Sequence, residues 1–266
     1  MNAPALKDIW LGQSVALLKA LHILTHNGGL NADSRRKLKQ VQHLAQLIKP
    51  AIDDALKEKD QPLLADLGAG KSYLGFILYD LYFGPAGRGR VLAVETRPEL
   101  IAAAKKIADA GDFPRMDFVQ ARITDTEVGP VDIVTALHAC DTATDEAILF
   151  ALRHQAKYVA LVPCCQAEVA HQLEEVKGPL AQLWRHPIQR REFGAHLTNV
   201  LRGLFLEAQG YKVRVTEFTG LEHSLKNEFI FAERHQRANP RARTEFERLV
   251  KEAGAAPKLL TAWNKP

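Results

Sequence analysis

Residues 66–70, Asp-Leu-Gly-Ala-Gly, combine an acid with two glycines in a pattern that suits the binding of a nucleotide-type cofactor. Gly68 permits backbone angles that a side chain would forbid, and Gly70 lets a ligand approach the main chain closely. An apolar run precedes this turn and a helical pattern follows it, so we expect the turn at the carboxyl end of a buried strand. The helix start then offers unpaired N–H groups to a ligand.

The common phosphate-binding patterns fit this turn poorly. The dinucleotide pattern G-x-G-x-x-G fails because Tyr73 holds the third glycine position. The phosphate-loop pattern G-x-x-x-x-G-K-[ST] fails because Ala65 stands where the first glycine belongs, although Lys71 and Ser72 follow the turn. Asp66 itself favours a cationic or amino-bearing ligand. S-adenosylmethionine has an amino-acid tail, a sulfonium charge and no phosphate; the alternative is an ordinary turn whose acid caps the helix.

The ends of the next two expected strands supply the remaining contacts for such a cofactor. Residues 90–95 form an apolar run that ends in Glu95, 29 residues after Asp66, where an acid hydrogen-bonds ribose hydroxyls in βαβ nucleotide folds. The third strand end carries no acid for the adenine amino group, so we expect Gln120 or nearby main-chain groups there. The predicted cofactor-binding residues are Asp66, Gly68, Ala69, Gly70, Glu95, Gln120, Ala121 and Leu137.

S-adenosylmethionine donates a methyl group, so a second molecule must accept it. We expect the residues that contact this acceptor at the ends of the fourth and fifth strands, because ligands of open α/β sheets bind beyond the carboxyl ends of the strands. All three cysteines of the chain are found there, in His138-Ala139-Cys140-Asp141 and Pro163-Cys164-Cys165. The polar loop 220–227, with His223, is a further candidate for substrate contact. The candidate catalytic residues are His138, Cys140, Asp141, Cys164, Cys165 and His223.

Three chemical interpretations of these residues compete with plain burial of the cysteines as small hydrophobic side chains. In the first, one cysteine attacks a pyrimidine ring. In the second, cysteines and a histidine bind zinc, but adjacent cysteines rarely share one ion and the C-x2–4-C spacing is absent, so we predict no metal site. In the third, which we favour, the segments shape the acceptor pocket and His138 or Asp141 positions the acceptor or takes its proton. S-adenosylmethionine is a strong methyl donor, so alignment supplies much of the catalysis.

The elements around these residues alternate as in a parallel α/β fold. We expect a helical segment over 1–60, an α/β domain over 61–235 and a basic tail over 236–266. The first helix is predicted by an amphipathic face of Ile9, Ala16, Leu17, Ala20, Leu21 and Leu24. The second runs from Arg35 to about Leu56, with Pro50 as a candidate position for a break. The expected strands are 63–67, 90–95, 116–121, 131–137, 158–163, 212–218 and 227–233, the last two antiparallel.

The composition is that of a soluble globular protein, with 47% hydrophobic and 25% charged residues and a net charge of +4. No apolar run approaches the 18 residues of a membrane span, and charged residues interrupt the N-terminal apolar stretch, so we expect neither a membrane anchor nor a signal peptide. Three cysteines are too few for a disulfide framework, which predicts a cytoplasmic location. The oligomeric state is left open.

The pattern D-x-G-x-G, followed by an acid that closes the next strand, resembles the class I S-adenosylmethionine-dependent methyltransferases. This resemblance implies a Rossmann-like, seven-stranded, mostly parallel sheet with an antiparallel last strand, here with an N-terminal helical extension. The segments 137–141, 163–165 and 222–227 resemble one methyltransferase subgroup that includes a eukaryotic tRNA ribose methylase. Over about residues 35–235, this likeness implies cofactor binding at Asp66, Gly68, Gly70 and Glu95 and suggests an RNA acceptor.

Basic clusters agree with an RNA acceptor if they converge near the fourth and fifth strand ends, although charge runs are usually solvated helix faces. The clusters are Arg35–Lys39, Arg185/Arg190/Arg191 and the tail around Arg237, Arg241 and Arg243. Trp184 and Phe193 either stack on bases or belong to the core. The adenine amino-methylase signature [DNS]-P-P-[YFW] is absent, which disfavours that reaction. The alternatives are a methyltransferase of a small molecule or protein, and a non-catalytic S-adenosylmethionine-binding regulator.

Overall fold

The strands predicted from the sequence form with nearly the expected bounds. The computed structural model describes residues 8–137, 139, 141–163, 166–218, 228–235 and 237–263. The strands are β1 Leu63–Leu67, β2 Arg90–Glu95, β3 Met116–Gln120, β4 Ile133–Leu137, β5 Tyr158–Val162, β6 Tyr211–Glu217 and β7 Glu228–Arg234. Most of them are short, mainly apolar runs bounded by polar or turn-forming residues, whereas β6 alternates polar and apolar residues, and both patterns are typical of strands.

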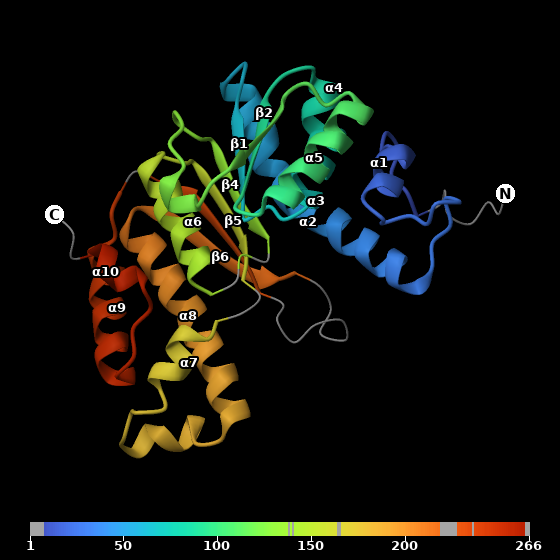
Figure 1. The fold of residues 1–266 in the computed structure, drawn as a ribbon. Helices are drawn as coiled ribbons and strands as arrows, with labels where there is room; N and C mark the ends of the chain where they lie inside the picture. The colour runs from blue at the N-terminus through green and yellow to red at the C-terminus, as the bar shows by residue number, and fades with distance from the viewer. Residues whose placement is uncertain are drawn as a thin grey trace. The chain divides into compact units, whose positions relative to one another are not determined.

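These seven strands form one sheet in the order β3-β2-β1-β4-β5-β7-β6 within the described residues (Figure 1). β1 pairs in parallel with β2 and with β4, and β2 pairs in parallel with β3. β7 runs antiparallel to both β5 and β6. The predicted α/β class, with a mostly parallel sheet and an antiparallel last strand, is confirmed.

Helices connect the strands. The α-helices are α1 Val15–Ala20, α2 Ala32–Glu58, α3 Tyr73–Leu78, α4 Gly84–Ala86, α5 Pro98–Gly111, α6 Thr142–Arg153, α7 Glu168–Gln172, α8 Pro187–Ala208, α9 Pro240–Ala253 and α10 Leu259–Trp263. The other helical turns are η2 Tyr79–Phe83, η3 Ile123–Asp125 and η4 Pro179–Trp184. In the part of the chain that the structure describes, none of them is both long and apolar enough to cross a membrane.

By packing, the chain divides into two compact units, Met1–Thr135 and Ala136–Pro266. The first unit holds β1, β2 and β3 with the helices from α1 to α5. Its core includes an aromatic cluster in which the ring of Phe113 lies 5.3 Å from Phe76 and 5.2 Å from Tyr79, both edge-on. The predicted segment boundaries near residues 60 and 235 stay predictions.

The N-terminal helices differ in detail from the predicted ones. α1 is short, and of the predicted apolar face Leu17, Leu21 and Leu24 are buried while Ala16 and Ala20 are exposed. α2 continues through Pro50 without a break. Its buried side, with residues such as Leu44, Ile48 and Ile52, lies on both sides of the proline, so packing holds the helix together where local propensity would end it.

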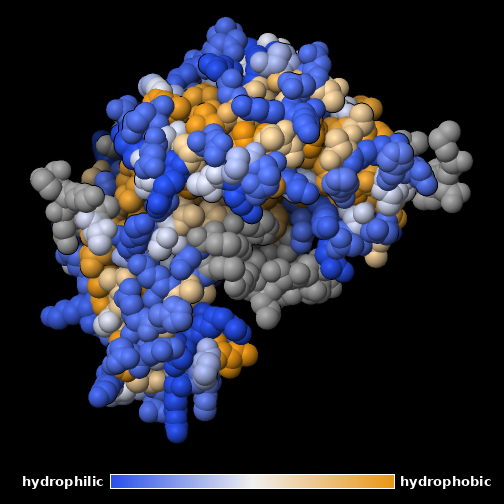
Figure 2. All heavy atoms as spheres, viewed as in Figure 1, coloured by the Kyte–Doolittle hydropathy of each residue, from blue (hydrophilic) through white to orange (hydrophobic). Residues whose placement is uncertain are grey.

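The second unit is built on the buried strand β5 and its antiparallel neighbour β7. The long helix α8 packs along α9, with the rings of Phe205 and Phe246 6.2 Å apart (Figure 1). After β5 the chain forms a helical lobe from α7, η4 and the first turns of α8. The surface in Figure 2 is largely hydrophilic there, although Leu180, Leu183 and Ile188 of this lobe are exposed.

Candidate functional site

The glycine turn after β1 has the backbone shape that the sequence predicts. Gly68 and Gly70 have φ angles of +62° and +59°, in the left-handed region that favours glycine. Ser72, at φ 55°, occupies the same region just before α3. A Cβ on Gly75 would lie 2.6 Å from Ser72 Oγ and 3.3 Å from Asp66 Oδ2. Glycine therefore lets the first turn of α3 approach the end of β1 closely.

Asp66 lies beneath this turn and is only 2% exposed. Its Oδ1 accepts a hydrogen bond from Thr135 Oγ1 at 2.9 Å, and its Oδ2 lies 3.5 Å from Ser72 Oγ. Burial raises the pKa of the carboxyl group to about 6, against the opposing effect of hydrogen bonds from Thr135, Gly75 and Ser72. These contacts make Asp66 the link that joins β1, β4 and α3. Direct contact of Asp66 with a cofactor stays a prediction.

Glu95, at the end of β2, faces the glycine turn and is 5% exposed. Its Oε2 accepts a hydrogen bond from the Gly70 N–H at 2.9 Å, and its Oε1 accepts one from the Thr96 N–H at 2.9 Å. The Arg97 guanidinium binds the same carboxylate at both oxygens, each at 3.1 Å. Burial raises the pKa of Glu95, but hydrogen bonds from Arg97 and Gly70 outweigh this and hold it at about 2. The carboxylate is therefore charged at every physiological pH.

The third strand end adjoins Glu95. Gln120 is the register partner of Glu95 across β2 and β3, and the Ala121 N–H donates to the Glu95 carbonyl oxygen at 3.2 Å. Ala69 is held in the same way, because its N–H donates to the Val94 carbonyl oxygen at 3.0 Å. The predicted residues of the first unit are thus brought together at the carboxyl ends of β1, β2 and β3. Leu137 ends β4 and belongs to the second unit.

This arrangement fits S-adenosylmethionine by its donor and acceptor chemistry. A charged carboxylate stands where ribose hydroxyls need an acceptor, and two left-handed glycines leave the main chain of the turn open to a ligand. When bound, the cofactor supplies an activated methyl group. Glu95 would hold its ribose, and residues 68–70 would accommodate its amino-acid part.

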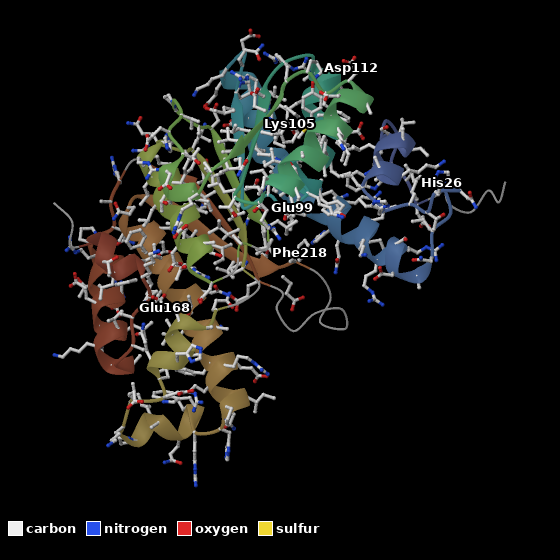
Figure 3. All side chains as sticks on the ribbon, in the orientation of Figure 1. His26, Glu99, Lys105, Asp112, Glu168 and Phe218 are labelled. Carbon is white, nitrogen blue, oxygen red and sulfur yellow. The ribbon has the colours of Figure 1, made fainter. Side chains whose placement is uncertain are left out.

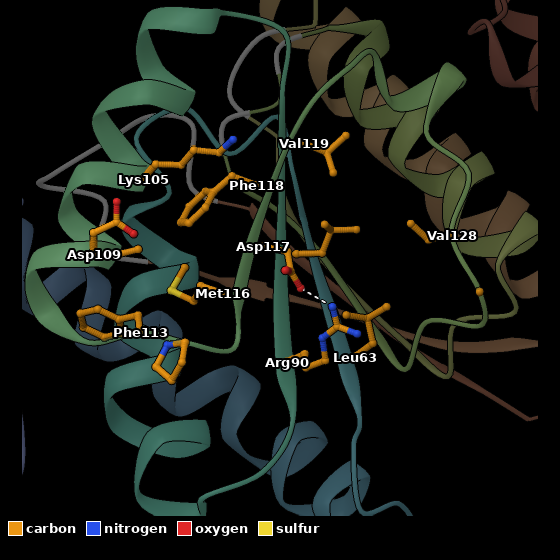
Figure 4. Close-up of a pocket in the computed structure, with 14 residues that line it drawn as sticks. Leu63, Arg90, Lys105, Asp109, Phe113, Met116, Asp117, Phe118, Val119 and Val128 are labelled. Atoms are coloured by element: carbon orange, nitrogen blue, oxygen red, sulfur yellow. Dashed lines mark hydrogen bonds and ion pairs between the residues drawn. The ribbon is translucent and has the colours of Figure 1, made fainter.

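A separate pocket of about 800 Å³ lies in the first unit, beside α5 and the edge strand β3 (Figure 4). Its lining includes Lys105, Phe113, Phe118 and the ion pair of Arg90 with Asp117. The predicted cofactor residues do not line it. Its lining includes Leu63, Arg90 and Met116, the first residues of β1, β2 and β3, so the pocket is distinct from the glycine turn at the carboxyl end of β1.

Among the candidate catalytic residues, the structure describes Asp141. His138, Cys140, Cys164, Cys165 and His223 lie outside the described residues, and their roles stay predictions. Asp141 precedes α6 with φ 52° and ψ −119°, an unusual backbone conformation for a residue with a side chain. Its Oδ1 accepts hydrogen bonds from the Ala167 N–H at 3.0 Å and the Glu168 N–H at 3.2 Å. The carboxylate therefore ties the segment after β4 to the start of α7, where Figure 3 labels Glu168.

A buried polar cluster behind Asp141 was missed by the sequence analysis. Arg202 of α8 and Asp145 of α6 form an ion pair of 2.6 Å, and each is 1% exposed. Burial raises the pKa of Asp145, and the Arg202 charge opposes that shift. Asn199, one helical turn before Arg202, shares its environment. Arginine side chains on helices are mostly exposed to solvent, so the residues around Arg202 in the sequence did not indicate that it is buried.

The predicted basic clusters differ in how much charge they leave free. Arg35 pairs with Asp8 and Lys37 with Asp33, while on α9 Arg243 pairs with Glu247 and Arg248 with Glu252. In the middle cluster, Arg190 pairs with Glu174. Trp184 is 2% exposed and its ring lies 4.9 Å from that of Phe193. Trp184 is thus a core residue of the helical lobe, and its buried ring is not accessible for stacking on RNA bases.

Comparison with known proteins identifies the family. The family model described as "Methyltransferase domain" matches residues 36–172, just over half of the 266-residue chain. The chain belongs to this methyltransferase domain family, as the turn at Asp66–Gly70 and the acid Glu95 predicted. Its cofactor is S-adenosylmethionine, the methyl donor of the class.

Individual relatives are distant. The chain is 27% identical over 159 residues to a Bos taurus "Glutathione S-transferase C-terminal domain-containing protein", and the match covers 60% of this chain and 24% of that protein. The chain therefore spans about a quarter of that relative's length. An rRNA methylase from Streptococcus thermophilus is 10% identical, with a TM-score of 0.45, and the match covers 74% of this chain and 94% of that one. TrmK of M. capricolum, solved with S-adenosyl-homocysteine, is 11% identical, with a TM-score of 0.43 and coverage of 74% and 68%. At this similarity, neither structure identifies an acceptor for this chain.

Proposed function

We propose that the protein transfers the methyl group of S-adenosylmethionine to RNA, either tRNA or rRNA, in the cytoplasm. The resemblance of residues 137–141, 163–165 and 222–227 to a tRNA ribose methylase favours this acceptor. The observation that carries the proposal is a cationic surface in the helical lobe that follows β5, where Lys177, Arg185 and Arg191 pair with no acid among the described residues. Nucleic-acid binders need such cations because each one neutralises a backbone phosphate.

This surface belongs to the helical lobe of the second unit. Residues 176–191 contain Lys177, Arg185, Arg190 and Arg191 and no acid. Lys177, Arg185 and Arg191 are exposed and form no ion pair with any residue that the structure describes. The predicted clusters on α2 and α9, by contrast, are partly neutralised by pairs within their own helices.

A pocket of about 210 Å³ connects the cationic surface with the end of β5. Its lining includes Arg190 and Arg191, together with Glu174, the ion-pair partner of Arg190. Gln166 and Ala167, which directly follow Cys164 and Cys165 in the sequence, also line it. An RNA backbone bound along the lobe would therefore pass close to the segment in which the sequence predicts acceptor chemistry.

The deciding experiment is transfer of labelled methyl groups to RNA from a strain that lacks the gene. We expect that RNA to be methylated and wild-type RNA, which already carries the modification, to stay unlabelled. If every RNA pool stays unlabelled while the protein binds S-adenosylmethionine, the RNA proposal is wrong. A small-molecule or protein acceptor, or a non-catalytic binding protein, would then remain.

A matched pair of variants tests the surface itself. Arg185→Ala with Arg191→Ala should weaken RNA binding and lower the slope of log affinity against log salt by about one unit for each cation removed. Arg243→Ala with Arg248→Ala removes two arginines whose charges already pair with glutamates, and should change the slope little. Equal effects of the two double variants would contradict the assignment of the lobe.

A separate question is which side chain removes the proton from the RNA group that becomes methylated. Single replacement of Cys140, Cys164 and Cys165 by Ser tests a cysteine nucleophile, and full methyl transfer by all three variants would exclude it. The favoured interpretation would then be that His138 or Asp141 positions the RNA acceptor or takes its proton.

A further inference from the structure

Arg202 makes three hydrogen bonds with one buried guanidinium group. Its Nε donates to Asp145 Oδ1 at 2.6 Å, its Nη1 to Asn199 Oδ1 at 3.1 Å and its Nη2 to the Asp141 carbonyl oxygen at 2.8 Å. The last contact reaches the residue that follows His138-Ala139-Cys140. Arg202 thus holds the main chain at Asp141, between β4 and α6.

Asn199 extends the same cluster to two further segments. Its Oδ1 also accepts a hydrogen bond from Gln166 Nε2 at 3.2 Å, and its Nδ2 donates to Glu228 Oε2 at 2.8 Å. Gln166 directly follows Cys164-Cys165, and Glu228 directly follows the loop that contains His223. Asn199 is 6% exposed and Gln166 is 5% exposed, so water competes little for these bonds.

The three residues bound by Arg202 and Asn199 are distant in sequence, but each adjoins or ends a segment that we predict to contact the methyl acceptor. Asp141 is the last residue of the predicted acceptor segment 137–141, while Gln166 and Glu228 come immediately after the predicted segments 163–165 and 222–227. One face of α8, with Asn199 and Arg202 three residues apart, binds all of them. All of these residues lie within the second unit.

Stability alone gives little reason for such a cluster. A buried ion pair rarely stabilises a fold more than apolar side chains of the same volume would. The planar guanidinium of Arg202 and the amide of Asn199 do, however, fix the positions of the bound segments relative to one another. This matters because small displacements at a reacting centre lower the rate of catalysis.

We propose that Arg202 and Asn199 are positioning residues, which hold the three acceptor-side segments after β4, after β5 and before β7 in one arrangement for methyl transfer. This inference rests on the proposed function, because it takes those segments to receive the methyl acceptor. Neither residue needs to touch the acceptor or the cofactor.

The first test needs no methyl acceptor, so it separates failure of this proposal from failure of the proposed function. The rate at which N-ethylmaleimide labels each cysteine is measured by mass spectrometry. In Asn199→Ala, which frees Gln166, we expect Cys164 and Cys165 to react about tenfold faster than in the wild type, because local opening controls such rates. The matched control is Thr198→Val, which removes another buried hydrogen bond of α8, from Thr198 Oγ1 to the Gly194 carbonyl oxygen.

The second test uses a rescue that general destabilisation would not produce. Asn199→Asp keeps the acceptor for Arg202 and Gln166 but places a carboxylate against Glu228. We expect a kcat at least about tenfold lower with an unchanged KM for S-adenosylmethionine, since like charges in contact repel. Adding Glu228→Gln supplies an amide donor to Asp at position 199 and should restore most of kcat.

Defined outcomes decide the proposal. Selective labelling in Asn199→Ala, together with rescue by the second substitution, supports it. Equal acceleration of labelling in Asn199→Ala and Thr198→Val overturns it, as does a double variant that is as slow as Asn199→Asp. Arg202→Lys should show the largest effect; if that variant does not fold, the Asn199 variants still decide.

Discussion

Replacing Asp66 by Asn should make the protein more stable at pH 8 and less stable at pH 4. Asp66 is 2% exposed, and burial raises the pKa of its carboxyl group from 3.8 to about 6 in the folded state. The folded protein therefore binds this proton more tightly than the unfolded chain does. Stability contributed by this group is present below pH 3.8 and is lost as the pH rises through about 6.

The size of the effect follows from the difference between the two pKa values. About two pKa units at 1.36 kcal/mol each correspond to roughly 3 kcal/mol lost between pH 4 and pH 8. Asparagine cannot ionise, so the variant avoids this loss. It does have to rearrange the bonds to Thr135 and Gly75, at a cost of about 1 kcal/mol. We expect the variant to be about 1 kcal/mol less stable at pH 4 and about 2 kcal/mol more stable at pH 8.

Urea unfolding of the wild type and the variant at pH 4, 6 and 8 measures this difference directly. Asp109→Asn, which removes a carboxylate at an exposed position of α5, is the matched control. A difference for Asp66→Asn that changes by less than about 1 kcal/mol over this range would refute the reasoning, and so would the opposite sign. Calorimetry on the same variant asks whether Asp66 contacts the cofactor: unchanged affinity would assign it the structural link alone.

Three further predictions concern the cofactor end of the first unit. Glu95→Gln should weaken S-adenosylmethionine binding by about 10- to 100-fold in calorimetry, because ribose hydroxyls lose a charged acceptor; affinity within twofold of wild type would contradict this role. Arg97→Ala removes guanidinium bonds that hold the pKa of Glu95 at about 2, so cofactor affinity should fall at a higher pH during acidification than in the wild type; superimposable pH profiles would count against it. Gly75→Ala should destabilise the protein by about 1–3 kcal/mol in urea unfolding, because its Cβ would lie 2.6 Å from Ser72 Oγ. Gly129→Ala, where a Cβ meets nothing within 4 Å, is the control and should be nearly neutral.

Local sequence carried much of the fold. Most strands are short, mainly apolar runs between polar residues, and β6 alternates polar and apolar residues, so their positions follow from local patterns and length. The turn at Gly68 and Gly70 follows from the need for left-handed backbone angles. The break considered at Pro50 shows the limit of local rules, because α2 continues through the proline, with residues buried on both sides of it.

The sequence by itself determined the sheet, the glycine turn and the acid at the end of β2, and with them the methyltransferase family. Those features are encoded within a few residues, by periodicity and by the special backbone freedom of glycine. The tertiary structure alone decided that Asp66 is bonded to Thr135, 69 residues away, and that Arg202 is bonded to Asp141, 61 residues away. Such contacts depend on strand register and helix packing, which bring together side chains whose local patterns carry no sign of one another. The acid of the glycine turn was therefore visible in the sequence, whereas its burial, and the hydrogen bonds that join α8 to Asp141, Gln166 and Glu228, were not.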